Sequence, residues 1–430
     1  MYRFAAAALA LTLFVAAAPL TAEQDHQRIL NQLHIKALRP GVSADPHAPN
    51  PANYDEAKAN PYPKLPDPLK LKNGKPVTST DMWWQQRRQE LADDIEAEIY
   101  GKMQSTVRSL NWTAVDSRPE TVGRIPTTRR YLIAQLAGGP NGVEVRMIVN
   151  LPAKAKGPVP LILLLTNGNA PGQHSTWRER VLAKGWGAAV LDVTSVQPDD
   201  GKDLARGVIG LFANGKPRDP SAWGALRAWA WGASRAMDYF ENDPGIDPTH
   251  VGIAGHSRYG KAALIAMAYD PRYAVAYISS SGAGGAALLR RNFGERIENL
   301  AATDEYHLFA ADFLKYAGPK TANDLPVDTH ELIALAAPHP IFFSAGADGD
   351  DWADPRGMFM AAAAASPVYE LLGRKGVGAT AMPPVGKPLT GGELAFSLHR
   401  QGDTMEPNWP AFLNYAQRYM KPAKPPKKGK

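Results

Sequence analysis

Short apolar segments alternate with helical patterns along most of this chain, and no other feature narrows its possible folds as much. Several of these segments are continuously apolar, which is typical of strands covered on both faces of a parallel sheet. Between them, apolar residues recur at intervals of three and four, as on one face of a helix. We expect strands at 130–136, 143–151, 160–165, 187–193, 251–255, 274–279, 340–345 and 378–383, and helices at 80–100, 176–184, 223–241, 261–269, 355–372 and 409–419.

The order of these segments predicts a three-layer α/β sandwich. Two strands that read as a hairpin come first and strand–helix units follow, so the sheet should be mixed, mostly parallel and covered by helices on both faces. A chain of 430 residues with 44% hydrophobic content is long enough to form such a domain over residues 69–420. In sheets of this kind the functional site lies beyond the carboxyl ends of the strands.

The amino-terminal part of the chain differs in composition from this body. Residues 1–22 read as a secretory signal peptide, because Arg3 is followed by an apolar run that is short for a membrane span. We therefore expect a periplasmic or secreted protein without a membrane anchor. Residues 23–68 are rich in proline, alanine and asparagine, which predicts an extended segment laid over the body. The chain has no cysteine, so its stability cannot depend on disulfides.

The net charge of +6 does not indicate a nucleic-acid partner. Five lysines of the basic tail at 421–430, together with Arg3, account for the whole excess of positive charge. A neutral body with a basic, proline-rich tail lacks the groove of cations that binds phosphates. No residue pattern implies a metal ion or a cofactor, and we expect a monomer.

A serine framed by glycines marks the candidate site. The stretch GIAGHSRYGK at 252–261 is an apolar strand that ends at Ser257 and continues directly into a helix. This is the context of a nucleophile elbow, a sharp turn that pushes the serine hydroxyl into a cleft. The spacing G-x-S-x-x-G is one residue longer than the usual one, and an ordinary glycine-flanked turn is the competing interpretation.

The order of the possible partners favours the nucleophile. In α/β-hydrolases an acid after a later strand and then a histidine near the carboxyl terminus follow the serine. His399 is the only histidine after the candidate acids, and the acidic loop at 348–354 supplies Asp350, with Asp348 in reserve. His399 would take the proton of Ser257, Asp350 would orient the imidazole, and the Arg258 amide would receive the oxyanion. A surface histidine and a calcium-binding acidic loop are the competing interpretations.

Two cations accompany the nucleophile. Arg258 is adjacent to it and Lys261 lies one helical turn further on, so both can face the same pocket. Cations at a helix amino terminus favour an anionic or hydroxyl-rich substrate. Salt bridges to neighbouring acids are the alternative.

The chain resembles the glucuronoyl esterases of carbohydrate esterase family 15. Their signature G-C-S-R-x-G-K matches residues 255–261 except that His256 replaces the cysteine. The resemblance runs from about residue 65 to residue 419. Further matching text is found at 281–285 (SGAGG), 290–295 (RRNFGE), 325–328 (LPVD) and 351–355 (DWADP).

The resemblance implies an α/β-hydrolase fold and an activity. The expected reaction is hydrolysis of the ester that joins 4-O-methylglucuronoyl groups of glucuronoxylan to lignin alcohols. By the same resemblance, Lys261 and Glu305 contact the sugar hydroxyls, Trp352 packs on the sugar, and the Arg258 side chain helps to stabilise the oxyanion. Another carbohydrate esterase, such as an acetyl-xylan esterase, and a non-catalytic polysaccharide-binding relative are the alternatives.

The match departs from the family at the triad acid and at one sugar contact. Many members carry the acid as a glutamate where this chain has Ser280, whereas some bacterial members use an aspartate after the later strand, which agrees with Asp350. Ile297 replaces a sugar-contacting glutamine of fungal members, and the neighbouring Glu298 is a candidate substitute. The other acids of the loop that remain candidates for the triad are Asp348, Asp351 and Asp354.

Overall fold

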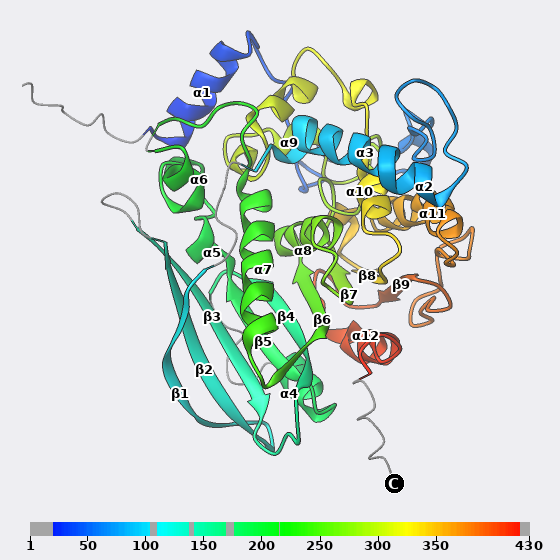
Figure 1. The fold of residues 1–430 in the computed structure, drawn as a ribbon. Coiled ribbons are helices and arrows are strands. Elements are labelled where there is room, and N and C mark those ends of the chain that lie inside the picture. Colours follow the sequence, from blue (N-terminus) through cyan, green and yellow to red (C-terminus); the bar gives the residue numbers. More distant parts are fainter. Residues whose placement is uncertain (1–19, 104–109, 137–141, 169–175, 215, 422–430) are drawn as a thin grey trace, which may run out of the picture.

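The computed structural model describes residues 20–103, 110–136, 142–168, 176–214 and 216–421 (Figure 1). The apolar run of the expected signal peptide and all but the first residue of the basic tail lie outside the described residues. Within the described part, none of the helices has the length and apolar character needed to cross a membrane.

One sheet of nine strands, in the order β1-β2-β3-β5-β4-β6-β7-β8-β9, runs through the described residues. The pairs β1–β2, β2–β3 and β3–β5 are antiparallel, and every pair from β5 to β9 is parallel. The predicted mixed, mostly parallel sheet is confirmed. The strands are β1 Trp112–Val122, β2 Ile125–Leu136, β3 Val143–Pro152, β4 Val159–Thr166, β5 Gly187–Asp192, β6 Ile246–His256, β7 Val275–Ser279, β8 Ile341–Gly346 and β9 Leu394–His399.

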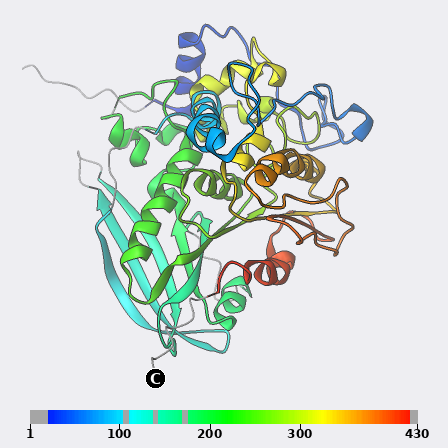
Figure 2. The ribbon, with the colours of Figure 1, turned by 45° about the vertical axis from the view of Figure 1, so that its right-hand side comes forward.

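Helices cover both faces of the sheet (Figures 1 and 2). The α-helices are α1 Ala22–Gln32, α2 Thr80–Met82, α3 Arg88–Ile95, α4 Thr176–Ala183, α5 Val193–Val196, α6 Gly207–Phe212, α7 Ala225–Asn242, α8 Arg258–Tyr269, α9 Ile297–Leu300, α10 Thr329–Leu335, α11 Pro355–Leu371 and α12 Trp409–Ala416. Two π-helical segments, η2 Trp83–Arg87 and η3 Glu96–Tyr100, join α2 and α3 into the long helix expected at 80–100. The 3-10 turns are η1 Glu56–Lys58, η4 Gly201–Asp203, η5 Tyr306–Leu308, η6 Ala311–Ala317, η7 Ala322–Asp324, η8 Asp351–Ala353 and η9 Glu406–Asn408.

The two-residue period of the central strands divides the core between the two faces. In β4, Leu161 and Leu163 belong to the large core shared with α7, α8, α10 and α11. Ile162 and Leu164 point to the opposite face and pack into a smaller core with α4 and α12. Because both sets are buried, β4 is apolar throughout, which is why its sequence predicts a covered parallel strand.

One predicted strand is wrong, and two strands of the sheet were not predicted. The segment 378–383 is not a strand, since Gly378 has a φ of 67° and two prolines follow. The last strand is instead β9, a segment in which no strand was expected. The exposed edge strand β1 was missed because it is mostly polar, without an apolar face to give the two-residue period.

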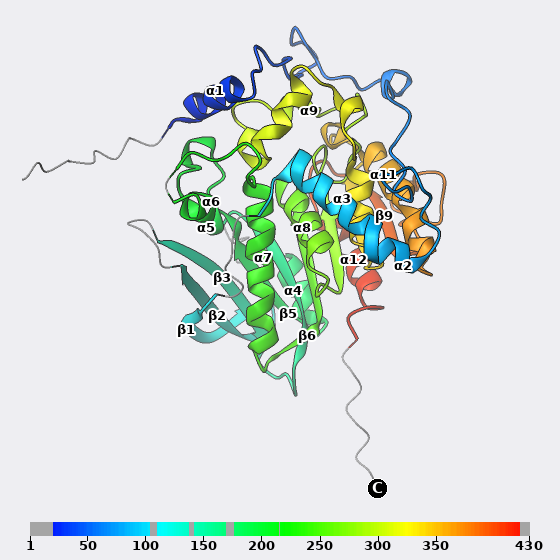
Figure 3. The same cartoon turned by 45° about the horizontal axis from the view of Figure 1, so that its top comes forward.

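The segment from α1 to residue 68 runs across the top of the body (Figure 3). Asp25 of α1 accepts a hydrogen bond from the Tyr306 hydroxyl at 3.0 Å. Further along, the side-chain amide of Asn299 donates to the Val42 carbonyl at 2.8 Å. These contacts fix the amino-terminal segment against the loop that carries residues 297–306.

Candidate active site

The chain turns sharply at Ser257, between β6 and α8. Ser257 has φ 53° and ψ −129°, a conformation that side chains rarely adopt. A Cβ atom at Gly255 would lie 2.2 Å from the Tyr259 carbonyl oxygen, so the preceding glycine is required for the turn. The Ser257 amide is held by the Ser279 carbonyl at 2.9 Å. The backbone therefore has the form that a nucleophile elbow requires.

Ser257 lines a cavity of about 580 Å³ at the carboxyl ends of the parallel strands. Arg258, Lys261, Glu305 and Trp352, which sequence analysis had assigned to substrate binding, all line this cavity. A pocket of this volume is within the range of small-molecule sites.

Of the four candidate acids in the loop at 348–354, Asp350 is the one that lines the cavity. It follows β8, is only 3% exposed, and accepts hydrogen bonds at 2.7 Å from both the Ser280 hydroxyl and the Gly346 amide. Burial raises the pKa of Asp350, against the effect of these two hydrogen bonds. Ser280, noted above as a departure from the family, is thus the direct partner of this carboxylate.

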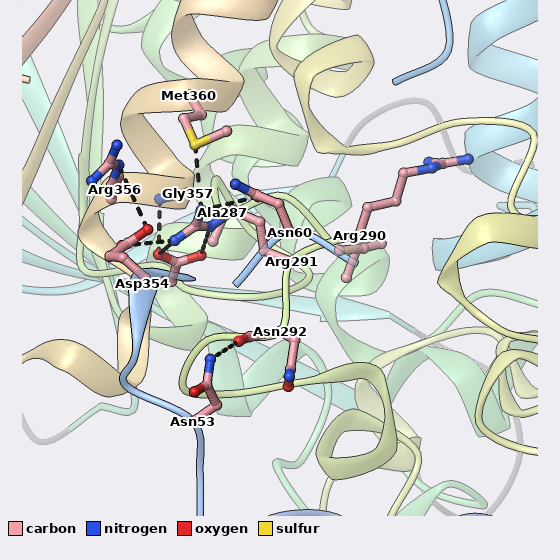
Figure 4. A network of polar contacts seen from close by, with 12 residues as sticks. Asn53, Asn60, Ala287, Arg290, Arg291, Asn292, Asp354, Arg356, Gly357 and Met360 are labelled. Atoms are coloured by element: carbon pink, nitrogen blue, oxygen red, sulfur yellow. Dashed lines mark hydrogen bonds and ion pairs between the residues drawn. The ribbon is translucent and has the colours of Figure 1, made fainter. Parts of the chain in front are cut away.

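The other acids of the loop have different surroundings. Asp348 and Asp351 are exposed. Asp354 is buried and forms an ion pair with Arg291, at 2.7 Å from Nε (Figure 4). It also caps α11 by accepting from the Gly357 amide at 2.9 Å. Its position is therefore structural, and among the four acids Asp350 has the surroundings that suit a triad.

His399 ends β9 at the same edge of the sheet. β9 pairs with β8, and the Ala347 amide donates to the His399 carbonyl at 2.7 Å. The imidazole Nε2 lies 2.8 Å from the Thr404 carbonyl oxygen, and Nδ1 is buried without a partner. Among the described residues, no hydrogen bond joins His399 to Ser257 or to Asp350. The structure thus places Ser257 after β6, Asp350 after β8 and His399 at the end of β9, without the two hydrogen bonds of a triad among the described residues.

Both cations beside the nucleophile are paired with acids. Arg258 contacts Asp199 at 3.0 Å and Glu305 at 2.6 Å, and Lys261 contacts Glu295 at 2.9 Å. Burial raises the pKa of Glu305, although Arg258 opposes this effect. Both cations therefore make the salt bridges that the alternative expects, and both also line the cavity.

The described lining of the cavity is not cationic. Two basic side chains face five acidic ones, which are Glu295, Asp304, Glu305, Asp350 and Asp403. The expectation of an anionic substrate thus loses its support, because the acids outnumber the cations. A hydroxyl-rich substrate suits the site, since carboxylates accept hydrogen bonds from sugar hydroxyls.

Several residues of the site were not found from the sequence. Asn299 lines the cavity, whereas its neighbour Glu298 pairs with Arg39 at 2.9 Å outside it and does not replace the family's glutamine. The His256 ring, in place of the cysteine, has its Nε2 3.0 Å from the Asp403 carboxylate and so links the elbow to the loop after β9. These partners are distant in sequence. The only sequence signal for any of them was the place of His256 within the family signature.

The described residues contain no cluster of three or more histidine, aspartate or glutamate side chains that could hold a metal ion. A serine hydroxyl after β6, a carboxylate after β8 and an imidazole at the end of β9 are the groups of nucleophilic acyl transfer.

Comparison with known proteins agrees with this chemistry. A family model described as "Glucuronyl esterase, fungi" matches residues 136–373, more than half of the chain. The chain is 33% identical to carbohydrate esterase MZ0003 from an unknown prokaryotic organism, over 89% of this chain and 94% of that protein. It is 30% identical to the 4-O-methyl-glucuronoyl methylesterase of Schizophyllum commune, over 72% of this chain and 74% of the relative.

Solved structures give the same result. A glucuronoyl esterase of carbohydrate esterase family 15 from Teredinibacter turnerae is 40% identical, with a TM-score of 0.87, and the match covers 93% of this chain and 99% of that one. The glucuronoyl esterase from Solibacter usitatus is 34% identical, with a TM-score of 0.78 and coverage of 85% and 100%. The resemblance drawn from the signature is confirmed. This chain belongs to the glucuronoyl esterases of carbohydrate esterase family 15, which are carboxylic ester hydrolases with the α/β-hydrolase fold.

Proposed function

We propose that this esterase cleaves the ester between 4-O-methylglucuronoyl side groups of xylan and lignin alcohols. The observation that carries the proposal is the strained elbow at Ser257, which opens into a cavity lined with hydrogen-bonding side chains. The similarity to a 4-O-methyl-glucuronoyl methylesterase supports the acyl group. Action on a cell-wall polymer also agrees with the export that we infer from the signal peptide expected at 1–22.

The proposed mechanism uses three side chains in turn. His399 removes the proton of Ser257 as its oxygen attacks the glucuronoyl carbonyl, and it then returns that proton to the leaving alcohol. Water hydrolyses the acyl-enzyme by the same route. Asp350 stabilises the imidazolium, which requires the His399 ring to turn away from the Thr404 carbonyl when substrate binds.

The oxyanion develops at the amino terminus of α8. The Arg258 amide is the first free N–H after Ser257, and the helix dipole favours negative charge there. The guanidinium of Arg258 also lines the cavity and adds a second source of positive charge. Both groups are in place before substrate arrives, so little reorganisation is needed during the reaction.

Recognition of the sugar fits the composition of the cavity. Lys261 donates hydrogen bonds, Glu305 and Asn299 accept them, and Trp352 offers an apolar face to the pyranose ring. A glucuronoyl ester has no charge at its carboxyl group. The acidic excess of the described lining therefore favours the ester over the free glucuronate produced by hydrolysis.

A comparison of two esters tests the proposal. Benzyl glucuronate should be hydrolysed with a much higher kcat/KM than 4-nitrophenyl acetate, because only the first can engage Lys261 and Glu305. A preference for the acetate would favour an acetyl-xylan esterase. Loss of turnover in Ser257→Ala would exclude the non-catalytic alternative, and full turnover in that variant would refute the mechanism.

A further inference from the structure

The guanidinium of Arg258 is held from two sides by carboxylates. Nη1 lies 3.1 and 3.0 Å from the two carboxylate oxygens of Asp199, and Nη2 lies 2.6 Å from Glu305. Glu305 lines the cavity and has a role in the proposed function, whereas Asp199 does not line the cavity. Asp199 can therefore act on the site only through its contact with Arg258.

Asp199 is itself fixed by buried neighbours. His307 Nε2 lies 3.0 Å from Asp199 Oδ1, and the His307 side chain is only 2% exposed. Two residues before Asp199, the carbonyl of the fully buried Gln197 accepts a hydrogen bond from the Trp229 indole of α7 at 2.8 Å. The carboxylate thus stands on a loop that is anchored in the core.

The charges of these groups also favour the contact between Asp199 and Arg258. Burial alone would raise the pKa of Asp199, but His307 and Arg258 outweigh burial and lower it. Asp199 is therefore ionised over the range in which an esterase works. In return, Glu305 and Asp199 raise the pKa of Arg258 despite its burial.

We infer that Asp199, held by His307, is a positioning residue that fixes the guanidinium of Arg258 beside Ser257. Arginine has several rotatable bonds, and ordering such a side chain costs conformational entropy. The carboxylates of Asp199 and Glu305, from separate segments, already order the guanidinium in the folded enzyme before substrate binds. The inference rests on the proposed function in one respect, the role of Arg258 at the developing oxyanion.

A double-mutant cycle tests the inference. We would measure kcat and KM for wild type, Asp199→Asn, Arg258→Gln and the double variant, on both benzyl glucuronate and 4-nitrophenyl acetate. Asp199→Asn should lower kcat by roughly 10- to 100-fold, because a misplacement of about 1 Å can have that effect. KM should change by less than about threefold, because Asp199 does not line the cavity.

The cycle separates positioning from a general structural effect. In the Arg258→Gln background, Asp199→Asn should cost less than about twofold, since the group that it positions is already gone. An equal loss in both backgrounds, or no loss in wild type, would overturn the inference. Asp200→Asn is the matched control, because Asp200 is the next residue, pairs with Lys202 and should leave kcat unchanged.

Two further outcomes are distinguishable. If wild type hydrolysed the acetate but not the glucuronate ester, the proposed substrate would be wrong, and the cycle on the acetate would still decide the role of Asp199. If Asp199→Asn failed to fold, Asp199→Glu would replace it in the cycle. That variant keeps the charge but displaces the carboxylate by one methylene, and its loss of kcat should again vanish without Arg258.

Discussion

Ser280 supplies a prediction that depends only on the structure. Its hydroxyl donates to Asp350 at 2.7 Å, and both residues are buried. A hydrogen bond to a charged group is worth about 1.5–3 kcal/mol. Ser280→Ala should therefore lower the free energy of unfolding by about that amount at neutral pH. Serine and alanine both carry a Cβ, so the positive φ of 45° at this position strains them equally.

The free energy of unfolding that Ser280→Ala loses should depend on pH in a defined direction. The serine hydroxyl stabilises the ionised form of Asp350, whose pKa burial already raises above that of an unfolded aspartate. Removing the hydroxyl raises the folded-state pKa further. The difference between wild type and variant is thus complete above the variant's pKa, shrinks as pH falls from there to the wild-type pKa, and is lost below it, because both proteins then hold a neutral carboxyl.

Urea unfolding at about pH 8 and about pH 4 measures this difference. Ser281→Ala is the control, because the neighbouring buried hydroxyl accepts from the Ala286 amide at 3.0 Å and does not touch Asp350. Its cost should be the same at both pH values. An equal loss at both pH values for Ser280→Ala, or a larger one at acid pH, would show that this hydroxyl does not support an ionised Asp350.

Three other perturbations follow from the same contacts. Ser257→Ala should lower kcat by roughly 10⁴- to 10⁶-fold in an ester assay without changing the thermal midpoint, and a loss below tenfold would exclude Ser257 as the nucleophile. Lys261→Met should mainly raise KM for benzyl glucuronate, while an unchanged KM would count against a sugar contact; the melting curve reports the cost of leaving Glu295 unpaired. Arg291→Met should destabilise the fold by about 3–5 kcal/mol, because it leaves the buried Asp354 carboxylate without its cation. Asp354→Asn in the same chain should recover part of this loss, and a double variant as unstable as the sum of the singles would refute the pairing.

Local signals explain how much of the fold could be predicted. The apolar run of β4 and the helical pattern of α7 both result from burial, and burial leaves a period in the sequence. The glycine spacing around Ser257 was also informative, because close backbone approach at Gly255 excludes any side chain. β1 left no such signal, since an exposed edge strand needs neither a continuous apolar run nor a regular period.

The contacts within the site could not be predicted in the same way. Asp199 and Glu305 meet at Arg258 only because two loops converge on the amino terminus of α8. Sequence reasoning identified the cations but could not see which acids would pair with them. The same holds for His399, which was expected as the base but not at the end of a strand, and whose contact with the Thr404 carbonyl could not be predicted either.

The serine at position 280 and the aspartate at position 350 depend on each other. The Ser280 oxygen lies within hydrogen-bonding distance of the Asp350 carboxylate, in a buried part of the site. A glutamate at position 280 would therefore meet a second carboxylate there. Two buried carboxylates in contact cannot both remain ionised at modest cost, because each raises the pKa of the other. A hydroxyl at 280 avoids this conflict and donates a hydrogen bond to the remaining acid. Under the proposed mechanism, moving the acid from 350 to 280 without this repulsion would therefore require both residues to change together.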